Sequence, residues 1–137
     1  MSRALFWMTT FAALLSCVSA SSADRSRLAA GVWGGPHIRL DVAEDGTAAV
    51  EFDCAHGAIT EPIVPDGQGA FRAAGTFTRE HPGPVREGRE GAGRPAVYAG
   101  KVEGERMTLT ITLAGSGEEL GSYELIRGKT PRLTKCL

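Results

Sequence analysis

The sequence predicts an all-β fold: a small up-and-down antiparallel β-barrel of 7–8 strands, with a flattened β-sandwich as the alternative. Apolar and polar residues alternate with the period of half-buried strands over most of the chain beyond about residue 30. Short glycine-containing turns separate these stretches, and no amphipathic helical pattern interrupts them. A meander of this kind loses its exposed edges when it closes on itself, which favours the barrel.

Residues 1–23 have the layout of an export signal, with a cationic start, an apolar run over 4–15 and then small residues. The apolar run is too short to span a bilayer. Two endings fit the pattern. Ordinary cleavage is expected after Ala20 or Ala23, whereas the residues up to Cys17 resemble the lipobox of bacterial lipoproteins, in which Cys17 would carry the lipid. We therefore expect an exported protein, either periplasmic or lipid-anchored to the bacterial envelope.

The rest of the chain is expected to comprise a short tether over 24–30 and one domain over 31–137, because this length suffices for a single core. Removing the signal leaves 14 basic and 16 acidic residues. Without a basic surplus, we expect no nucleic-acid partner, and membrane attachment only through a lipid on Cys17.

Three cysteines become two when Cys17 is lipidated or removed, and an exported chain then favours a disulfide between Cys54 and Cys136. Closing a loop of roughly 80 residues would contribute on the order of 4 kcal/mol in the chain-entropy model. Two unpaired buried thiols are the alternative.

The stretch from Gly31 to Gly57 predicts a long β-hairpin with Trp33 at its entrance. Placing Leu40 opposite Phe52 requires a three-residue loop, Asp45-Gly46-Thr47, and puts Arg39 opposite Asp53. The residues expected on its inner face are Ile38, Leu40, Val42, Val50, Phe52 and Cys54.

Further strands follow from the same alternation, and residues 80–94 form a long loop without any apolar period. Beyond this loop the chain turns at 103–105 and 115–117 and ends in an irregular tail. The expected strands cover 58–64, 71–78, 98–102, 107–113 and 121–125.

Gly31-Val32-Trp33 resembles the G-x-W signature of the calycin barrels, the lipocalin and avidin-like group. In those folds an arginine near the last strand packs over the tryptophan. Arg127 is in phase with Tyr123 and Leu125, so the resemblance implies that its guanidinium lies over Trp33 where the barrel closes.

Four further segments resemble a set of exported bacterial proteins of unknown function. They are WGGPHI at 33–38, EFDCAHG at 51–57, REHPGPVR at 79–86 and KCL at 135–137. This resemblance implies export but no activity.

The histidines offer one route to chemistry, since His56, His81 and Glu80 are residue types that bind zinc or copper. Alternation places His37 and Asp53 on the face opposite to His56, which argues against one site for all of them. The alternatives are a metal-binding protein or metal-dependent hydrolase that uses His56, His81 and Glu80, or separate rim histidines.

The loop over 80–94 is a positional candidate, because structureless loops of this length are uncommon in small domains. Its arginines, Arg86, Arg89 and Arg94, could meet an anionic ligand or partner, although nearby glutamates could equally make it a solvated loop. No serine or carboxylate pair has a catalytic setting.

These observations favour a non-enzymatic exported binding protein without a cofactor. It would hold a small ligand, or an envelope protein such as a hydrolase that it inhibits, at the barrel mouth and the 80–94 loop. An empty ligand-sized cavity would favour the small ligand, whereas a filled barrel with a protruding loop would favour the protein partner.

Overall fold

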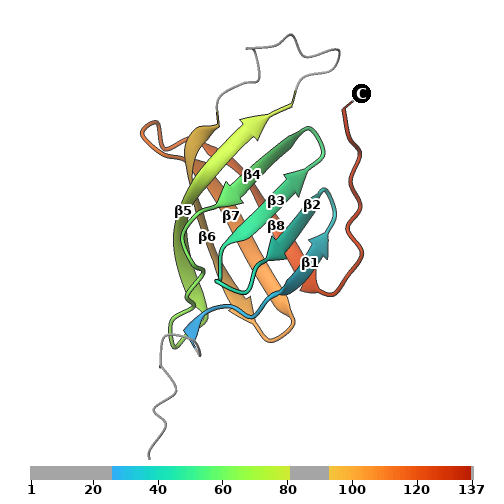
Figure 1. The fold of residues 1–137 in the computed structure, drawn as a ribbon. Coiled ribbons are helices and arrows are strands. Elements are labelled where there is room, and N and C mark those ends of the chain that lie inside the picture. The colour runs from blue at the N-terminus through green and yellow to red at the C-terminus, as the bar shows by residue number, and fades with distance from the viewer. Residues whose placement is uncertain (1–25, 81–92, 137) are drawn as a thin grey trace, which may run out of the picture.

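The computed structural model describes residues 26–80 and 93–136, and its eight strands form a closed antiparallel barrel (Figure 1). The strands are β1 (Gly31–Gly35), β2 (Ile38–Val42), β3 (Ala48–Phe52), β4 (Ala55–Ile59), β5 (Ala70–Arg79), β6 (Arg94–Glu103), β7 (Arg106–Leu113) and β8 (Glu119–Arg127). The predicted up-and-down barrel is confirmed, and the sandwich is not formed. Within the described ranges, no helix is long and apolar enough to cross a membrane.

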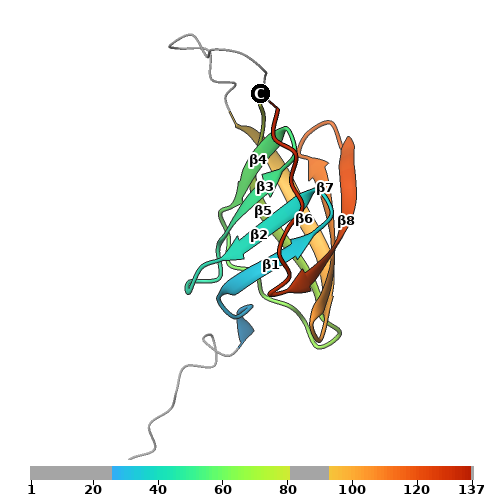
Figure 2. The same cartoon turned by 90° about the vertical axis from the view of Figure 1, so that its right-hand side faces the viewer.

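Each strand pairs with the next one in the chain, and β8 returns to pair with β1 (Figure 2). The closing pairs are Trp33 with Arg127 and Gly34 with Ile126. Only two pairs hold this seam, whereas β6 and β7 share eight. The barrel is therefore closed by a short contact between the middle of β1 and the C-terminal end of β8.

The predicted register of β2 against β3 is wrong by two residues, since Leu40 lies opposite Val50 and not Phe52. A five-residue loop over 43–47 replaces the expected three-residue loop. The Ala43 N–H donates to the Thr47 carbonyl at 2.8 Å, and Asp45 accepts from the Thr47 N–H at 3.0 Å. A slip of two keeps the strand side chains on their expected faces, so all the predicted inner residues except Cys54 are buried, although their cross-strand partners differ from the prediction.

Beyond β3, the chain turns two residues earlier than the alternation predicted. Cys54 does not continue β3 but lies with Asp53 in the turn that leads into β4. The strand expected over 58–64 is instead β4, over Ala55–Ile59, and residues 60–69 are irregular. Arg39 consequently lies opposite Glu51, and Asp53 lies in the turn between β3 and β4.

Apolar side chains fill the interior of the barrel, and the described residues include no buried charged side chain. Tyr98 is fully buried, and its hydroxyl donates to the Thr76 carbonyl at 2.6 Å. Burial also raises the pKa of this phenol, which stays neutral. The middle of the barrel is thus a packed core.

One end of the barrel, which we call the closed end, is covered by residues from outside the strands. Leu28 lies in the segment expected to be a tether, yet it is buried, and its N–H donates to the Ile63 carbonyl at 2.8 Å. Ile63 is fully buried, and its own N–H donates to the Gly46 carbonyl at 2.8 Å. Together with Trp33, these side chains form an apolar lid.

The C-terminal tail, residues 128–136, leaves β8 and runs along the outside of β1 towards the other end of the barrel (Figures 1 and 2). The backbone of Arg132 forms hydrogen bonds with Gly35 and His37. A side chain at Gly34 would collide with the Lys129 carbonyl, so the glycine in β1 lets the tail approach.

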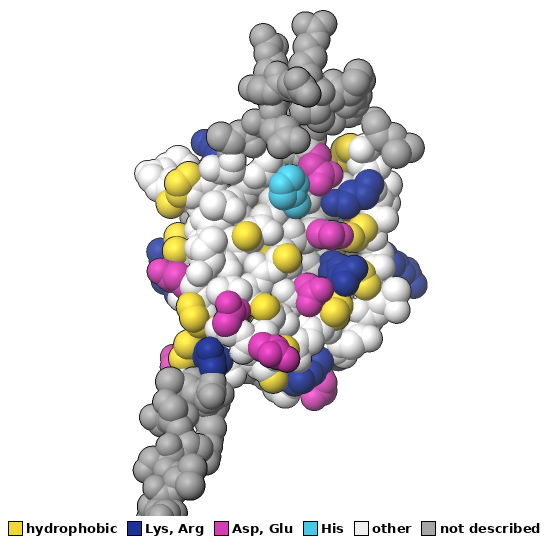
Figure 3. Space-filling model, viewed as in Figure 1, with side chains coloured by type: hydrophobic (Ala, Val, Ile, Leu, Met, Phe, Trp, Pro, Cys, Tyr) yellow, Lys and Arg dark blue, Asp and Glu magenta, His cyan; other side chains and the backbone are white. Residues whose placement is uncertain are grey.

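The outer wall over β2–β5 carries acidic and basic side chains intermixed with small hydrophobic ones (Figure 3). Among the described residues, Val64 is the only large hydrophobic side chain that is mostly exposed. The wall therefore offers no large apolar patch for a partner.

Candidate functional site

The end of the barrel opposite the closed end, which we call the mouth, gathers segments that are distant in the sequence. The turns at 36–37 and 53–54, the end of β5, the start of β6 and the tail over 132–136 meet there (Figure 1). Most of the predicted site residues that fall within the described ranges lie at this end.

Two histidine–carboxylate pairs lie at the mouth and use different partners. His37 Nδ1 lies 2.6 Å from Asp53 Oδ2, and His56 Nδ1 lies 3.1 Å from Glu80 Oε1. His37 occupies the β1–β2 turn with a positive φ of 67° after Pro36, a sequence suited to such a turn. The prediction that His56 lies on the face opposite to His37 and Asp53 is wrong, because the turn at 53–54 breaks the alternation and places the exposed His56 opposite the exposed Glu51 on the outer face.

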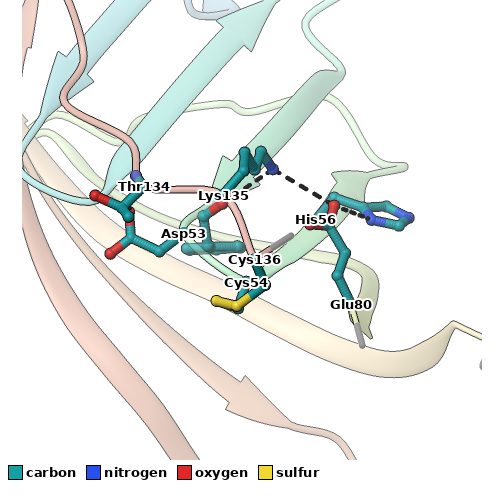
Figure 4. Close-up of polar contacts among 8 residues, drawn as sticks. Asp53, Cys54, His56, Glu80, Thr134, Lys135 and Cys136 are labelled. Atoms are coloured by element: carbon teal, nitrogen blue, oxygen red, sulfur yellow. Dashed lines mark hydrogen bonds and ion pairs between the residues drawn. A yellow bond between two sulfur atoms is a disulfide. The ribbon is translucent and has the colours of Figure 1, made fainter. Parts of the chain in front are cut away.

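The tail is fastened at the mouth by three kinds of contact (Figure 4). The Thr134 N–H donates to Asp53 Oδ1 at 2.8 Å, and Lys135 Nζ donates to the Phe52 carbonyl at 3.0 Å. The predicted disulfide between Cys54 and Cys136 is formed, with Cα atoms 5.2 Å apart. This separation is within the usual range for a disulfide.

Both carboxylates have lowered pKa values. The Thr134 N–H is the largest influence on Asp53 and lowers its pKa, with His37 and Lys135 adding to the effect against partial desolvation. For Glu80 the largest influence is desolvation, which raises the pKa, but His56 and Lys135 together outweigh it. Both groups are therefore anions with cationic or N–H partners at neutral pH.

Two hollows open beside these pairs. The first has a volume of about 280 Å³, and its lining includes Phe52, Phe77, Arg79, Leu120 and Tyr123. The second has a volume of about 390 Å³ and is lined by Phe77, Arg79, Arg94, Leu113, Glu118 and Leu120. The two share Phe77, Arg79 and Leu120, and both are near the lower limit for small-molecule sites.

An aromatic cluster forms the floor of the first hollow. Phe52 contacts Phe77 and Tyr123, with ring centroids 5.5 Å and 5.4 Å apart. Burial, followed by the charge of Asp53, raises the pKa of Tyr123, so its hydroxyl remains a neutral donor. The mouth thus combines an apolar surface with polar groups at its edge.

Several of the predicted site residues fall outside the described ranges. These are Cys17, His81, Arg86 and Arg89, together with most of the 80–94 loop. Arg94 is described and begins β6, so it is not part of a loop. No group of three or more metal-ligating side chains occurs within 26–80 and 93–136, and the alternative that uses His81 stays a prediction.

Arg127 lies near Trp33 at the barrel seam, with its guanidinium carbon 6.0 Å from the ring centroid. Trp33 is 1% exposed, and its indole Nε1 has no hydrogen-bond partner among the described residues. This pair belongs to the closed end and takes no part in the mouth.

Sequence reasoning missed Arg79, Leu120 and Lys135. The alternation of β5 contains the signal for Arg79, because Phe71, Ala73, Gly75 and Phe77 face inward and residue 79 is next in that series. Leu120 lies beside a break in the β7–β8 register, which no local pattern indicates.

Comparisons with protein-family models, with curated proteins and with solved structures find no match to this chain. The proposals below therefore depend on the geometry and chemistry of the mouth.

Proposed function

We propose that this protein is a non-enzymatic exported binding protein of the bacterial envelope, which holds a small ligand at the mouth of its barrel. The observation that supports this most directly is the difference between the two ends. At the closed end, Leu28 and Ile63 are buried in one core cluster with Trp33, whereas the mouth has two hollows with mixed apolar and charged linings. Concave sites with an apolar surface and a few polar groups are typical of ligand binding.

The filled middle of the barrel limits where that ligand lies. Tyr98 and the other large core side chains are fully buried, so a ligand would rest on the core at the rim. A filled barrel is also one of the two conditions that favour a protein partner, such as an inhibited hydrolase. The other condition, a protruding loop, concerns residues outside the described ranges. A protein partner is thus the second candidate.

The test is native mass spectrometry of the protein purified from its own envelope, because this reports bound small molecules and proteins together. Leu120→Trp would place a large ring in the shared part of the two hollows. Val64→Trp is the matched control, since it adds the same ring at an exposed position in the irregular segment after β4.

We expect a bound small molecule on the wild-type protein and on Val64→Trp, and its loss from Leu120→Trp. A protein partner that is lost in the same pattern would establish the second candidate. Binding unaffected by Leu120→Trp, or no bound mass on the wild-type protein, would contradict a site at the mouth.

A further inference from the structure

Two arginines lie on the inward face of adjacent strands at the second hollow. Arg94 pairs with Phe77 across β5 and β6, and Arg79 is two residues beyond Phe77 on the same face. Arg79 and Arg94 are therefore diagonal neighbours, a relation that brings Cβ atoms to within about 8 Å. Two side chains of this length can reach one anionic group from such positions.

The two carboxylates beside the first hollow are already engaged. Asp53 is paired with His37, and Glu80 is paired with His56 and Lys135. Neither Arg79 nor Arg94 forms an ion pair with another residue of the described ranges. Among the described residues that line the second hollow, these two arginines are positively charged and Glu118 is negatively charged.

The rest of that hollow is apolar. Phe77 and Leu120 are half-buried, and Leu113 is buried, so carbon surface lies directly beside the two guanidinium groups. Arginine recognises carboxylates through paired N–H donors, and its planar group also stacks on flat apolar surfaces. The volume of about 390 Å³ suits a compact molecule better than a long acyl chain.

We propose that the second hollow binds a small amphipathic carboxylate, with its anionic group on Arg79 and Arg94 and its apolar body on Phe77, Leu113 and Leu120. This inference rests on the proposed function and specifies its ligand class. Glu118 opposes such a ligand by like-charge repulsion, so it limits the affinity.

Isothermal titration calorimetry at pH 7 and low salt can test this with two probes of the same shape. 2-Naphthoate carries the carboxylate, and 2-naphthamide is its neutral counterpart. We expect naphthoate to bind the wild-type protein at least about tenfold more tightly, which is the lower range for a charge-assisted hydrogen bond. Raising the salt concentration should weaken naphthoate binding and leave naphthamide binding unchanged.

Four single variants, one of them a control, give the residue assignment. Arg79→Gln and Arg94→Gln should each weaken naphthoate binding by about tenfold without affecting naphthamide. Arg72→Gln is the matched control, because Arg72 is on the outward face of β5. Glu118→Gln should strengthen naphthoate binding severalfold. Thermal melts of each variant would verify that the barrel remains folded.

Equal affinity for the two probes would overturn the proposal, as would Arg79→Gln and Arg94→Gln behaving like Arg72→Gln. Binding of neither probe to the wild-type protein would overturn it too. The experiments also test the proposed function separately from this more specific assignment of the ligand. If a bound envelope molecule survives in Arg79→Gln and Arg94→Gln but is lost from Leu120→Trp, the mouth site stands and the anion assignment falls.

Discussion

The two ends of the barrel are held by different forces. At the closed end, Leu28 and Ile63 come from outside the strands and complete an apolar layer around Trp33. At the mouth, the fastening is polar and covalent: hydrogen bonds from the tail to Asp53 and Phe52, and the disulfide from Cys54. Burial stabilises one end, and specific links stabilise the other.

This difference explains how hollows can exist at one end of so small a barrel. If apolar side chains also covered the mouth, its two hollows would be filled. Links along one side of the rim secure the chain while leaving the region around Phe77 and Leu120 open. The following predictions test this division, from the largest expected effect to the smallest.

The largest effect is expected at the closed end. Trp33→Ala should lower the free energy of unfolding by about 3–5 kcal/mol, because it removes a fully buried ring from the core. Trp33→Phe should cost less than this, since the indole N–H it removes has no described partner. Urea denaturation measures both, with Val64→Ala as the exposed control. If Trp33→Ala cost no more than Val64→Ala, the closed end would not depend on burial.

At the mouth, replacing Cys54 and Cys136 by serine should lower the free energy of unfolding by up to about 4 kcal/mol in the chain-entropy model. The tail should become sensitive to trypsin at Lys129, Arg132 and Lys135 before the barrel melts. Limited proteolysis with mass analysis would follow these cuts, and cleavage at Arg106 in β7 serves as the internal control. Simultaneous cleavage of tail and barrel would show that the tail is an integral part of the fold.

A smaller effect is expected where Arg127 meets Trp33. Arg127→Ala should lower the free energy of unfolding by about 0.5–2 kcal/mol and shift the tryptophan emission to the red. The measurement needs a Trp7→Phe background, because Trp7 is the only other tryptophan. Unchanged stability and emission would mean that the guanidinium at 6.0 Å contributes nothing to the packing of Trp33.

The smallest effect concerns pH. The folded-state pKa of Asp53 is below the ordinary value of 3.8, so its stabilising contribution is complete above pH 3.8 and is lost as the pH falls through the lower value. The amide signal of Thr134 in nuclear magnetic resonance spectra should titrate in that range, and Asp53→Asn should abolish the titration.

Asp45 provides the matched control for this experiment. Its pKa is also lowered, chiefly by the Thr47 hydroxyl, but it lies in the β2–β3 loop near the closed end. Asp45→Asn should leave the Thr134 titration unchanged. A Thr134 signal that responds to Asp45 and not to Asp53 would contradict the fastening of the tail at the mouth.

The local sequence was sufficient to predict the barrel and the disulfide. Alternation along β5 and β7 places apolar residues on one face, and only packing that face inward removes it from water. On the prediction that Cys17 is lipidated or removed, cysteine counting leaves Cys136 as the partner of Cys54, and that disulfide is formed.

Local patterns could not decide which residues of β2 and β3 pair, or which residues cover the closed end. The two-residue slip between β2 and β3 changes no inner face, so hydrophobic alternation cannot distinguish the two pairings. At the closed end, the Ile63 N–H donates to the Gly46 carbonyl, and Leu28 is buried beside Ile63. Both contacts join segments that are distant in the sequence. Residues 24–30 look like a polar tether when read alone.

The sequence by itself therefore determined which residues face inward and that the chain forms antiparallel strands around an apolar core, because these follow from a two-residue period and the hydrophobic effect. Only the tertiary structure decided that the ends differ and that Arg79 and Arg94 border one hollow. The long-range closure of β8 on β1 and the path of the tail set that arrangement, and no local period encodes either.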